Sequence, residues 1–189
     1  RGLEVGVDGM NEKTQDREVL EKELGTPGPE RIWYVGDAFA MGLSVDEVFD
    51  LTKIDRWLLR QFAELVAFED RILSVKSPEA CPRDLMFAAK KLGYSDAQLA
   101  NAWLGEISSK SILAVRAARK KMGIEPVYKL VDTCAAEFDA VTPYYYSTYE
   151  APFTVNGKTV VDDEIRVTDR EKIVILGGGP NRIGQGIEF

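Results

Sequence analysis

The sequence of 189 residues contains no histidine, two cysteines and no apolar run long enough to cross a membrane. Without histidine the chain lacks the usual general base of enzymes and the commonest protein ligand of metals. Cys81 and Cys134 form no Cys-x-x-Cys pair, so we expect a reducing, cytoplasmic environment rather than a disulfide scaffold. A membrane helix needs about 18 or more consecutive apolar residues, so no membrane partner is expected.

Positive charge is also scarce, with 24 lysines and arginines against 31 aspartates and glutamates and a formal net charge of -7. Nucleic-acid binding requires clustered basic side chains, so no nucleic-acid partner is expected. The first residues, RGLEVGVDG, have neither the apolar core of a signal peptide nor an initiating methionine. We therefore expect a segment of a longer chain that holds either one domain or one domain and a fragment.

Helix starts and stops are well marked between residues 12 and 123. Ser44–Glu47 and Ser95–Gln98 have the pattern of capping boxes, and Thr52–Asp55 resembles a further N-cap. Glycines stand where helices are expected to end: Gly42, Gly93 and Gly123. The expected helices cover about residues 12–24, 30–41, 53–75, 82–92 and 110–122, with two short helices after the capping boxes. Ser108 or Ser109 is expected to cap the last of them.

The longest expected helix, from about Lys53 to Val75, carries two apolar stripes. The first stripe consists of Ile54, Trp57, Leu58, Phe62, Leu65 and Ile72. The second stripe consists of Leu59, Ala63, Val66 and Leu73. Two stripes indicate a helix that is contacted from two sides. Either the helix lies centrally in the core, or the second stripe is an interface with another domain or subunit.

After residue 125 the sequence becomes rich in valine, threonine and tyrosine, which predicts an extended connector with short strands. Asn156-Gly157, between FTV and KTVV, indicates a two-residue type I′ hairpin turn. KIVIL, which begins at Lys172, predicts a short parallel strand of the kind that is buried on both faces.

The loop after this strand, GGGPNRIGQG from Gly177, has the glycine content of a phosphate-binding turn. Arg182 stands where a dinucleotide fingerprint needs its third glycine, and Gln185 stands where a P-loop needs lysine. Two interpretations remain, a strand-to-helix turn that offers backbone N–H groups to an anion and the same turn without a ligand. A free-standing anion-binding or nucleotide-binding α/β domain built on this loop would need further strands after it.

Three other groups have both a chemical and a structural interpretation. Cys134 has no histidine to activate it as a nucleophile, so we expect a small buried residue. The acidic run from Asp162 to Glu164 fits either a hard cation or a solvated hairpin end. A tyrosine cluster fits either base stacking or packing, and the acidic composition favours packing; it consists of Tyr144, Tyr145, Tyr146 and Tyr149.

Five stretches together resemble the large subunit of carbamoyl phosphate synthetase. They are RGLEVG from Arg1, LTKIDRWLL from Leu51, PVYKLVDTCAAEF from Pro126, YYYSTYE from Tyr144 and GGGPNRIGQGIEF from Gly177. LTKIDRWLL is similar to the helical middle domain of that family, which is named for oligomerisation, although Lys53 stands where the family often has asparagine. The stretch that contains the expected hairpin is longer than the common linker of the family.

The resemblance implies a mainly α oligomerisation domain over residues 12–125, after the tail of a first ATP-grasp half at residues 1–11. It places an extended connector with a β-hairpin at residues 126–171 and the start of the second synthetic half at residues 172–189. Within the parent enzyme, Gly186 and Glu188 would lie along the passage of carbamate. The segment itself is expected to contain no catalytic residue, cofactor or metal site, and Leu59, Ala63, Val66 and Leu73 are its candidate interface.

The resemblance also implies what the parent protein does. The family consists of cytoplasmic ligases that make carbamoyl phosphate from bicarbonate, glutamine-derived ammonia and two ATP, for arginine and pyrimidine biosynthesis. Its cofactors are ATP and magnesium or manganese, with potassium. Its partners are the flanking ATP-grasp halves of the same chain, a glutaminase small subunit and further copies of the large subunit.

Overall fold

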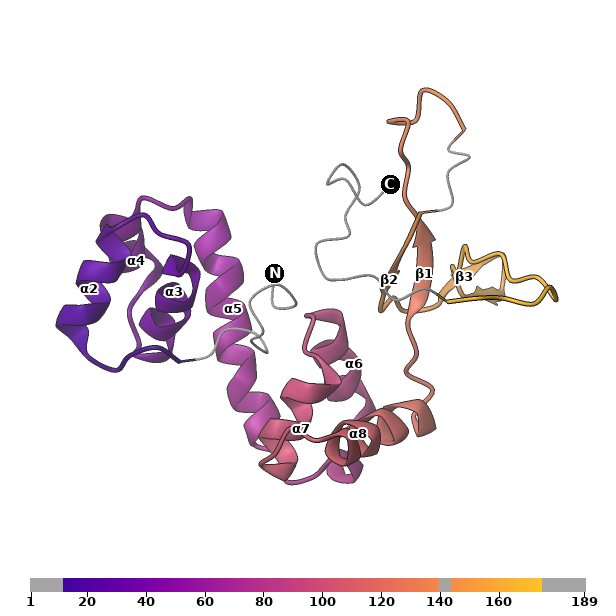
Figure 1. Cartoon of the computed structure of the whole chain (residues 1–189), viewed down its shortest axis with the longest axis horizontal. Helices are drawn as coiled ribbons and strands as arrows, with labels where there is room; N and C mark the ends of the chain where they lie inside the picture. Colours follow the sequence, from indigo (N-terminus) through magenta and orange to yellow (C-terminus); the bar gives the residue numbers. More distant parts are fainter. Residues whose placement is uncertain (1–11, 140–143, 175–189) are drawn as a thin grey trace. The chain divides into compact units, whose positions relative to one another are not determined.

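The computed structural model describes residues 12–139 and 144–174 (Figure 1). Seven α-helices and four short strands lie within these residues, so the fold is mainly α, as predicted. The helices are α2 (Arg17–Gly25), α3 (Arg31–Ala40), α4 (Val45–Thr52), α5 (Arg56–Leu73), α6 (Arg83–Lys91), α7 (Asp96–Leu104) and α8 (Ser109–Lys121), with a 3₁₀ helix at Pro78–Ala80. The strands are β1 (Val127–Leu130), β2 (Tyr145–Thr148), β3 (Phe153–Val155) and β4 (Lys158–Val160).

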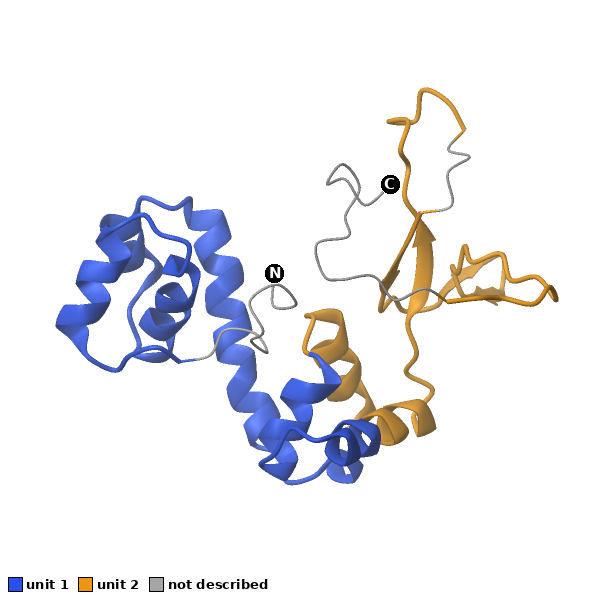
Figure 2. Ribbon diagram, viewed as in Figure 1, with its two compact units in different colours: residues 1–81, 95–115 blue, residues 82–94, 116–189 orange. Residues whose placement is uncertain are grey.

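The chain divides into two compact units, which Figure 2 shows in different colours. The first unit consists of residues 1–81 and 95–115, and the second of residues 82–94 and 116–189. The second unit therefore contains α6, the end of α8 and all four strands. In the part of the chain that the structure describes, no helix is both long enough and apolar enough to span a membrane.

The first unit has an apolar core built from α2, α3, α4 and α5. Leu20 and Leu24, four residues apart, lie on one face of α2 and are completely buried there. The buried members of the cluster are Leu20, Leu24, Val35, Ala38, Leu43, Val48 and Leu59. A fully buried side chain of leucine size contributes about 2 kcal/mol of hydrophobic free energy, so this cluster is the main source of stability of these four helices.

Most helix ends follow the local signals in the sequence. Both predicted capping boxes form, at the starts of α4 and α7. Ser108, rather than Ser109, caps α8, because the Ser108 hydroxyl accepts a hydrogen bond from the backbone N–H of Ser111 at 3.1 Å. The three glycines that were expected to end helices have φ of 87°, 94° and 70°: Gly42, Gly93 and Gly123. Such left-handed values favour glycine, so these helix ends are confirmed.

The first helix differs from the prediction, because α2 begins at Arg17 and not near residue 12. Asp16 is its N-cap, and the Asp16 carboxylate accepts hydrogen bonds from the backbone N–H groups of Glu18 and Val19. Residues 12–15, the described residues before Asp16, belong to no helix. Residues 12–15 continue the charged, helix-like pattern of α2, so the sequence pattern alone did not mark Asp16 as the start of the helix.

The strands form two separate two-stranded antiparallel sheets, β1 with β2 and β3 with β4. Val155 pairs with Lys158, which leaves Asn156 and Gly157 as the turn, with φ of 50° and 76°. Positive φ at both central residues defines a type I′ turn, so the predicted hairpin is confirmed.

The expected strand KIVIL is not formed over the part of it that the structure describes. Residues 172–174 have no strand pairing, and Ile173 is 92% exposed. A continuously apolar strand needs neighbouring strands on both sides, and the described residues supply none here. The rest of KIVIL and the glycine-rich loop, including Gly186 and Glu188, lie outside the described residues.

Candidate functional site

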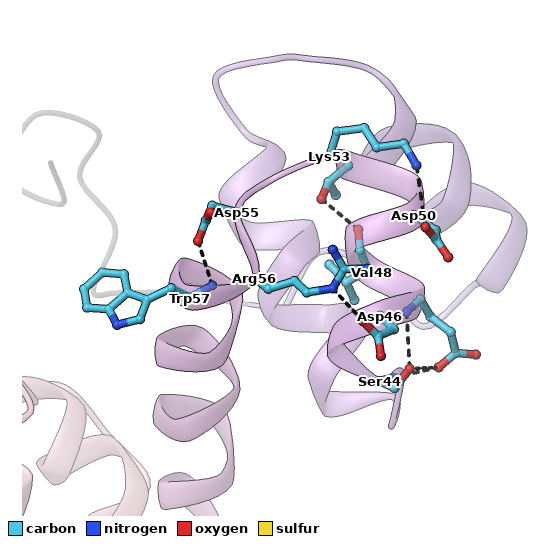
Figure 3. A network of polar contacts seen from close by, with 10 residues as sticks. Ser44, Asp46, Val48, Asp50, Lys53, Asp55, Arg56 and Trp57 are labelled. Atoms are coloured by element: carbon cyan, nitrogen blue, oxygen red, sulfur yellow. Dashed lines mark hydrogen bonds and ion pairs between the residues drawn. The ribbon is translucent and has the colours of Figure 1, made fainter.

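The junction between α4 and α5 is held by a set of short-range polar contacts (Figure 3). The Ser44 hydroxyl accepts the backbone N–H of Glu47 at 3.2 Å, and the Glu47 carboxylate accepts the backbone N–H of Ser44 at 2.7 Å. These hydrogen bonds from Ser44 lower the pKa of Glu47, first through its backbone N–H and then through its hydroxyl. The Arg56 guanidinium bonds the Asp46 carboxylate at 2.7 Å and ties the first turn of α5 to α4.

The start of α5 differs from the predicted one. Thr52 still belongs to α4, where its hydroxyl donates to the Val48 carbonyl oxygen at 2.7 Å. Lys53 ends α4 with a left-handed φ of 57°. Asp55 is the N-cap of α5 and accepts the Trp57 backbone N–H at 2.8 Å, so the helix begins at Arg56. Within the expected cap at Thr52–Asp55, Asp55 makes the capping hydrogen bond, and Thr52 does not cap α5.

The first apolar stripe of α5 is covered in part along its length. Ile54 and Phe62 are half-buried against the apolar core of the first unit. Ile72 is 1% exposed, and its carbonyl oxygen accepts the indole N–H of Trp103 on α7 at 2.9 Å. At the N-terminal end, Trp57 is 64% exposed and Leu58 is 45% exposed. Figure 3 shows the Trp57 side chain pointing away from the polar contacts of the α4–α5 junction.

The second stripe, which contains the candidate interface residues, has the opposite pattern. Leu59 is completely buried in the core cluster with α2, α3 and α4. Ala63 and Val66 are half-buried, and Leu73 is 50% exposed. The structure therefore does not bring the four candidate residues onto one exposed face. Leu59 is an intramolecular core residue, whereas Leu73 is open at the C-terminal end of the helix.

These patterns have one geometric cause. α3 and α4 pack against α5 near its start, and α7 packs against it near its end. Residues 59 and 72 lie about 140° apart around a helix with 3.6 residues per turn, so the two contacts use nearly opposite sides. The helix is contacted from two sides, as its two stripes predicted, but each side is covered along only part of its length. Two apolar surfaces remain, one at Trp57 and Leu58 and the other at Leu73.

Asp37 is a structural residue that the sequence interpretation missed. It lies within the apolar helix α3, is 5% exposed, and accepts the backbone N–H groups of Lys13 and Thr14 at 2.9 and 3.0 Å. A buried carboxylate requires such partners, because burying a charge without hydrogen bonds is costly. Asp37 thus fastens the segment before α2 to the helical core. The signal that could have found it is a lone acid in an otherwise apolar helix.

The acidic run after the hairpin forms part of a small sheet-like structure in the second unit. The Asp163 carboxylate accepts the backbone N–H of Tyr128 at 3.2 Å, and the Glu164 carboxylate accepts that of Leu130 at 2.5 Å. Because β2 occupies the other edge of β1, these carboxylates satisfy the edge that would otherwise be open. Within the described residues, no group of three or more acidic, cysteine or histidine side chains is arranged to hold a metal ion.

The remaining acid of this run, Asp162, pairs with a buried lysine on β1. The side chain of Lys129 is 9% exposed, and its ammonium lies 2.5 Å from the Asp162 carboxylate and 3.3 Å from that of Glu150. The hydrogen bond to Asp162 raises the pKa of Lys129, burial opposes this shift, and Glu150 adds to it. The three acids of the run therefore each contact β1, although all three residues are exposed.

The loop after β1 contains Cys134, which is half-buried and not fully buried as expected. The Asp132 carboxylate accepts the backbone N–H groups of Cys134 and Ala136 at 2.9 and 2.7 Å. Ala135 and Ala136 have φ of 51° and 60°, which costs roughly 1 kcal/mol or more per alanine. The Asp132 hydrogen bonds offset part of this strain, so the loop is held by its backbone contacts.

The tyrosine cluster splits between surface and packing. Tyr144, Tyr145 and Tyr146 are each at least 37% exposed. Tyr149 is half-buried, and the charged ends of Lys90 and Arg119 lie 5.4 and 5.9 Å from its ring centre. A cation over an aromatic face is attracted by the ring quadrupole, so Tyr149 has a packing role in the second unit.

A family model described as "Carbamoyl-phosphate synthetase large chain, oligomerisation domain" matches residues 1–123 of the 189-residue chain. The chain belongs to this family. The match ends at Gly123, so it covers the seven described helices and none of the four strands.

Curated relatives of the carbamoyl phosphate synthase family match the whole chain. The "Carbamoyl phosphate synthase large chain" of Ralstonia nicotianae is 47% identical over 189 residues, and that of Pseudomonas aeruginosa is 48% identical over 194 residues. The protein of the same name from Archaeoglobus fulgidus is 43% identical over 196 residues. In each case all of this chain is covered, but it spans only 16 to 17% of the relative.

Proposed function

We propose that this chain is the central oligomerisation and connecting domain of a carbamoyl phosphate synthase large chain. The family match over residues 1–123 is the observation that carries this proposal. The helical module supports it, because a connecting domain needs a stable core together with surfaces that neighbouring domains or copies can cover. α5 offers both, with Leu59 buried inside the module and Leu73 open at its end.

The parent protein would be a cytoplasmic, ATP-dependent carbon–nitrogen ligase. It would make carbamoyl phosphate from bicarbonate, ammonia and two ATP, with magnesium or manganese and potassium, for arginine and pyrimidine biosynthesis. A glutaminase small subunit would supply the ammonia. The flanking ATP-grasp halves carry out the chemistry, and the segment itself is non-catalytic. Its terminal loop contributes Gly186 and Glu188 to the carbamate passage.

The domain boundaries follow from the same proposal. Residues 1–11 are the tail of the first ATP-grasp half, and residues 12–125 are the oligomerisation domain. Residues 126–171 connect it to the second synthetic half, which begins at residue 172. The order of helices and strands supports this division, since the last described helix ends at Lys121 and the first described strand begins at Val127.

Self-association is assigned to the open end of the second stripe, at Val66 and Leu73. The test is the molar mass of the full-length large chain, measured by light scattering for Leu73→Asp and for Ala67→Asp. Both variants add one carboxylate to α5, and both positions are exposed, but Ala67 lies on the polar side of the helix. Leu73→Asp should lower the mass and Ala67→Asp should not. Equal masses for the two variants and the wild type would exclude this surface as the contact.

Catalytic inactivity of the isolated segment needs a separate test. Calorimetric titration of residues 1–189 with ATP and magnesium should give no binding in the micromolar range. The full-length protein should bind ATP and form carbamoyl phosphate under the same conditions. Micromolar binding of ATP by the segment alone would overturn its assignment as a purely connecting domain.

A further inference from the structure

The β3–β4 hairpin has one apolar face and one polar face. Its register pairs Phe153 with Val160 and Val155 with Lys158, so these four side chains lie on the same face. Thr154 pairs with Thr159 on the opposite face. The alternation is therefore that of a strand pair with one side packed and the other in contact with water.

None of the described residues buries the apolar face. Phe153 is 48% exposed, Val155 46% and Val160 37%. An isolated two-stranded hairpin is marginally stable in water and needs a third strand or a packing partner. Its Asn156-Gly157 turn and its β-branched strand residues favour the hairpin conformation locally, so a packing partner on the apolar face would complete its stabilisation.

We propose that this face packs on an apolar surface of the domain that follows the connector in the full-length chain, an inference that rests on the proposed function. Full-length relatives are about six times longer than this segment, and under the proposed function the second synthetic half follows the connector. The position of the hairpin also favours it. Glu164 holds the chain to β1, and residue 174 follows ten residues later.

The short linker from Glu164 to residue 174 favours the following domain over a second copy as the occupant of this face. Ten extended residues reach at most about 35 Å, so the following domain starts within that distance of the Glu164 anchor. A short tether gives an effective concentration in the millimolar range. A second copy bound through this face alone, at micromolar concentration, would need an affinity higher by about three orders of magnitude to compete. A copy held through α5 is connected to the hairpin only by way of the folded units, and not by a ten-residue link. The domain before the segment is tethered through the whole helical module and has no such advantage.

Photocrosslinking in the full-length protein tests this proposal directly. A benzophenone amino acid replaces Phe153 in one variant and Thr154, on the opposite face, in the control. Each variant is irradiated as an equal mixture of ¹⁴N-labelled and ¹⁵N-labelled chains, and the cross-linked peptides are identified by mass spectrometry. The probe at position 153 should react with a peptide that follows residue 189 in a chain of the same isotope. The probe at position 154 should react much less.

Other outcomes have a definite meaning. Cross-links that join a ¹⁴N-labelled peptide to a ¹⁵N-labelled peptide would assign the face to a second copy. A cross-link to residues before Arg1 would assign it to the preceding domain. Either result would overturn the proposal. Equal, weak reaction at both positions would show an uncovered hairpin and overturn it too. Synthesis of carbamoyl phosphate by the same unirradiated samples tests the proposed function separately, so an active protein without the expected cross-link refutes the docking alone.

Hydrogen exchange on the unmodified protein avoids any perturbation by the probe. The amides of the hairpin should exchange about tenfold more slowly in the full-length chain than in residues 1–189, because docking suppresses local opening. Amides of β1, which are held by β2 and by the acidic run in both samples, serve as the internal reference. Equal hairpin exchange in the two samples would refute the docking.

Discussion

Replacing Leu59 with alanine should destabilise the fold, whereas the same change at Leu73 should leave it almost intact. Both leucines lie on the second stripe of α5, and the sequence alone treats them alike. Leu59 is completely buried, and Leu73 is 50% exposed. The pair of variants therefore separates a core role from an interface role within one helix.

The expected magnitudes follow from burial. Removing a fully buried leucine side chain loses its transfer free energy and leaves a cavity, which together cost about 3 kcal/mol for Leu59→Ala. A half-exposed leucine loses about 1 kcal/mol or less, because only part of its surface is removed from water, and alanine is itself a good helix former. With a urea dependence of about 2 kcal/mol/M, the midpoint for Leu59→Ala should fall by about 1.5 M.

The assay is urea unfolding followed by far-ultraviolet circular dichroism at two protein concentrations. Two concentrations are needed because the stability of an oligomer depends on protomer concentration. The shift for Leu59→Ala should be the same at both. The reasoning would be refuted if Leu59→Ala unfolded like the wild type while its molar mass decreased, since Leu59 would then lie in an intermolecular contact.

Three further predictions concern polar contacts and the turn. Asp37→Ala should lower the free energy of unfolding by about 2 kcal/mol, since it removes two hydrogen bonds to a buried carboxylate. Proteolysis before α2 should increase in this variant. Asp37→Asn should lower the free energy of unfolding by less. Ser44→Ala should cost about 1 kcal/mol as a lost N-cap. The backbone N–H and the hydroxyl of Ser44 both lower the folded-state pKa of Glu47, so the contribution of Glu47 is present above the ordinary glutamate pKa and is lost as the pH falls through the lowered value. Ser44→Ala removes only the hydroxyl, the smaller of these two causes, so its unfolding curves should show a slightly weaker loss of stability in acid. A stronger loss than in the wild type would contradict this. Gly157→Ala places a side chain at a φ of 76°, which adds a strain of roughly 1 kcal/mol and should reduce the hairpin population measured by NMR. Thr159→Ser should have little effect on this population.

Local chemistry was predictable wherever the deciding contacts lie within a few residues of each other. The capping box at Ser44, the glycine that ends α3 and the type I′ turn at Asn156 all belong to this class. Each depends on a side chain or a φ preference that acts over two to four positions. These features appear in the structure at the residues that the sequence indicates.

The predictions that differ involve competition between neighbouring signals or contacts between distant residues. Thr52 and Asp55 are both good caps, and only the end of α4 at Lys53 decides that Asp55 begins α5. Asp37 binds the backbone 23 and 24 residues before it, and Glu164 binds that of Leu130, 34 residues before it. No periodicity or local propensity encodes partners at such separations.

The sequence by itself determined the family, the helical character of the module, most helix ends and the hairpin, because these depend on motifs and on short-range chemistry. Only the tertiary structure decided which residues of each α5 stripe are covered, and with it that Leu59 is core and Leu73 is surface. The physical reason is that an apolar stripe records only a tendency to leave water. Which neighbour covers it depends on where the loops place α3, α4 and α7 along the helix.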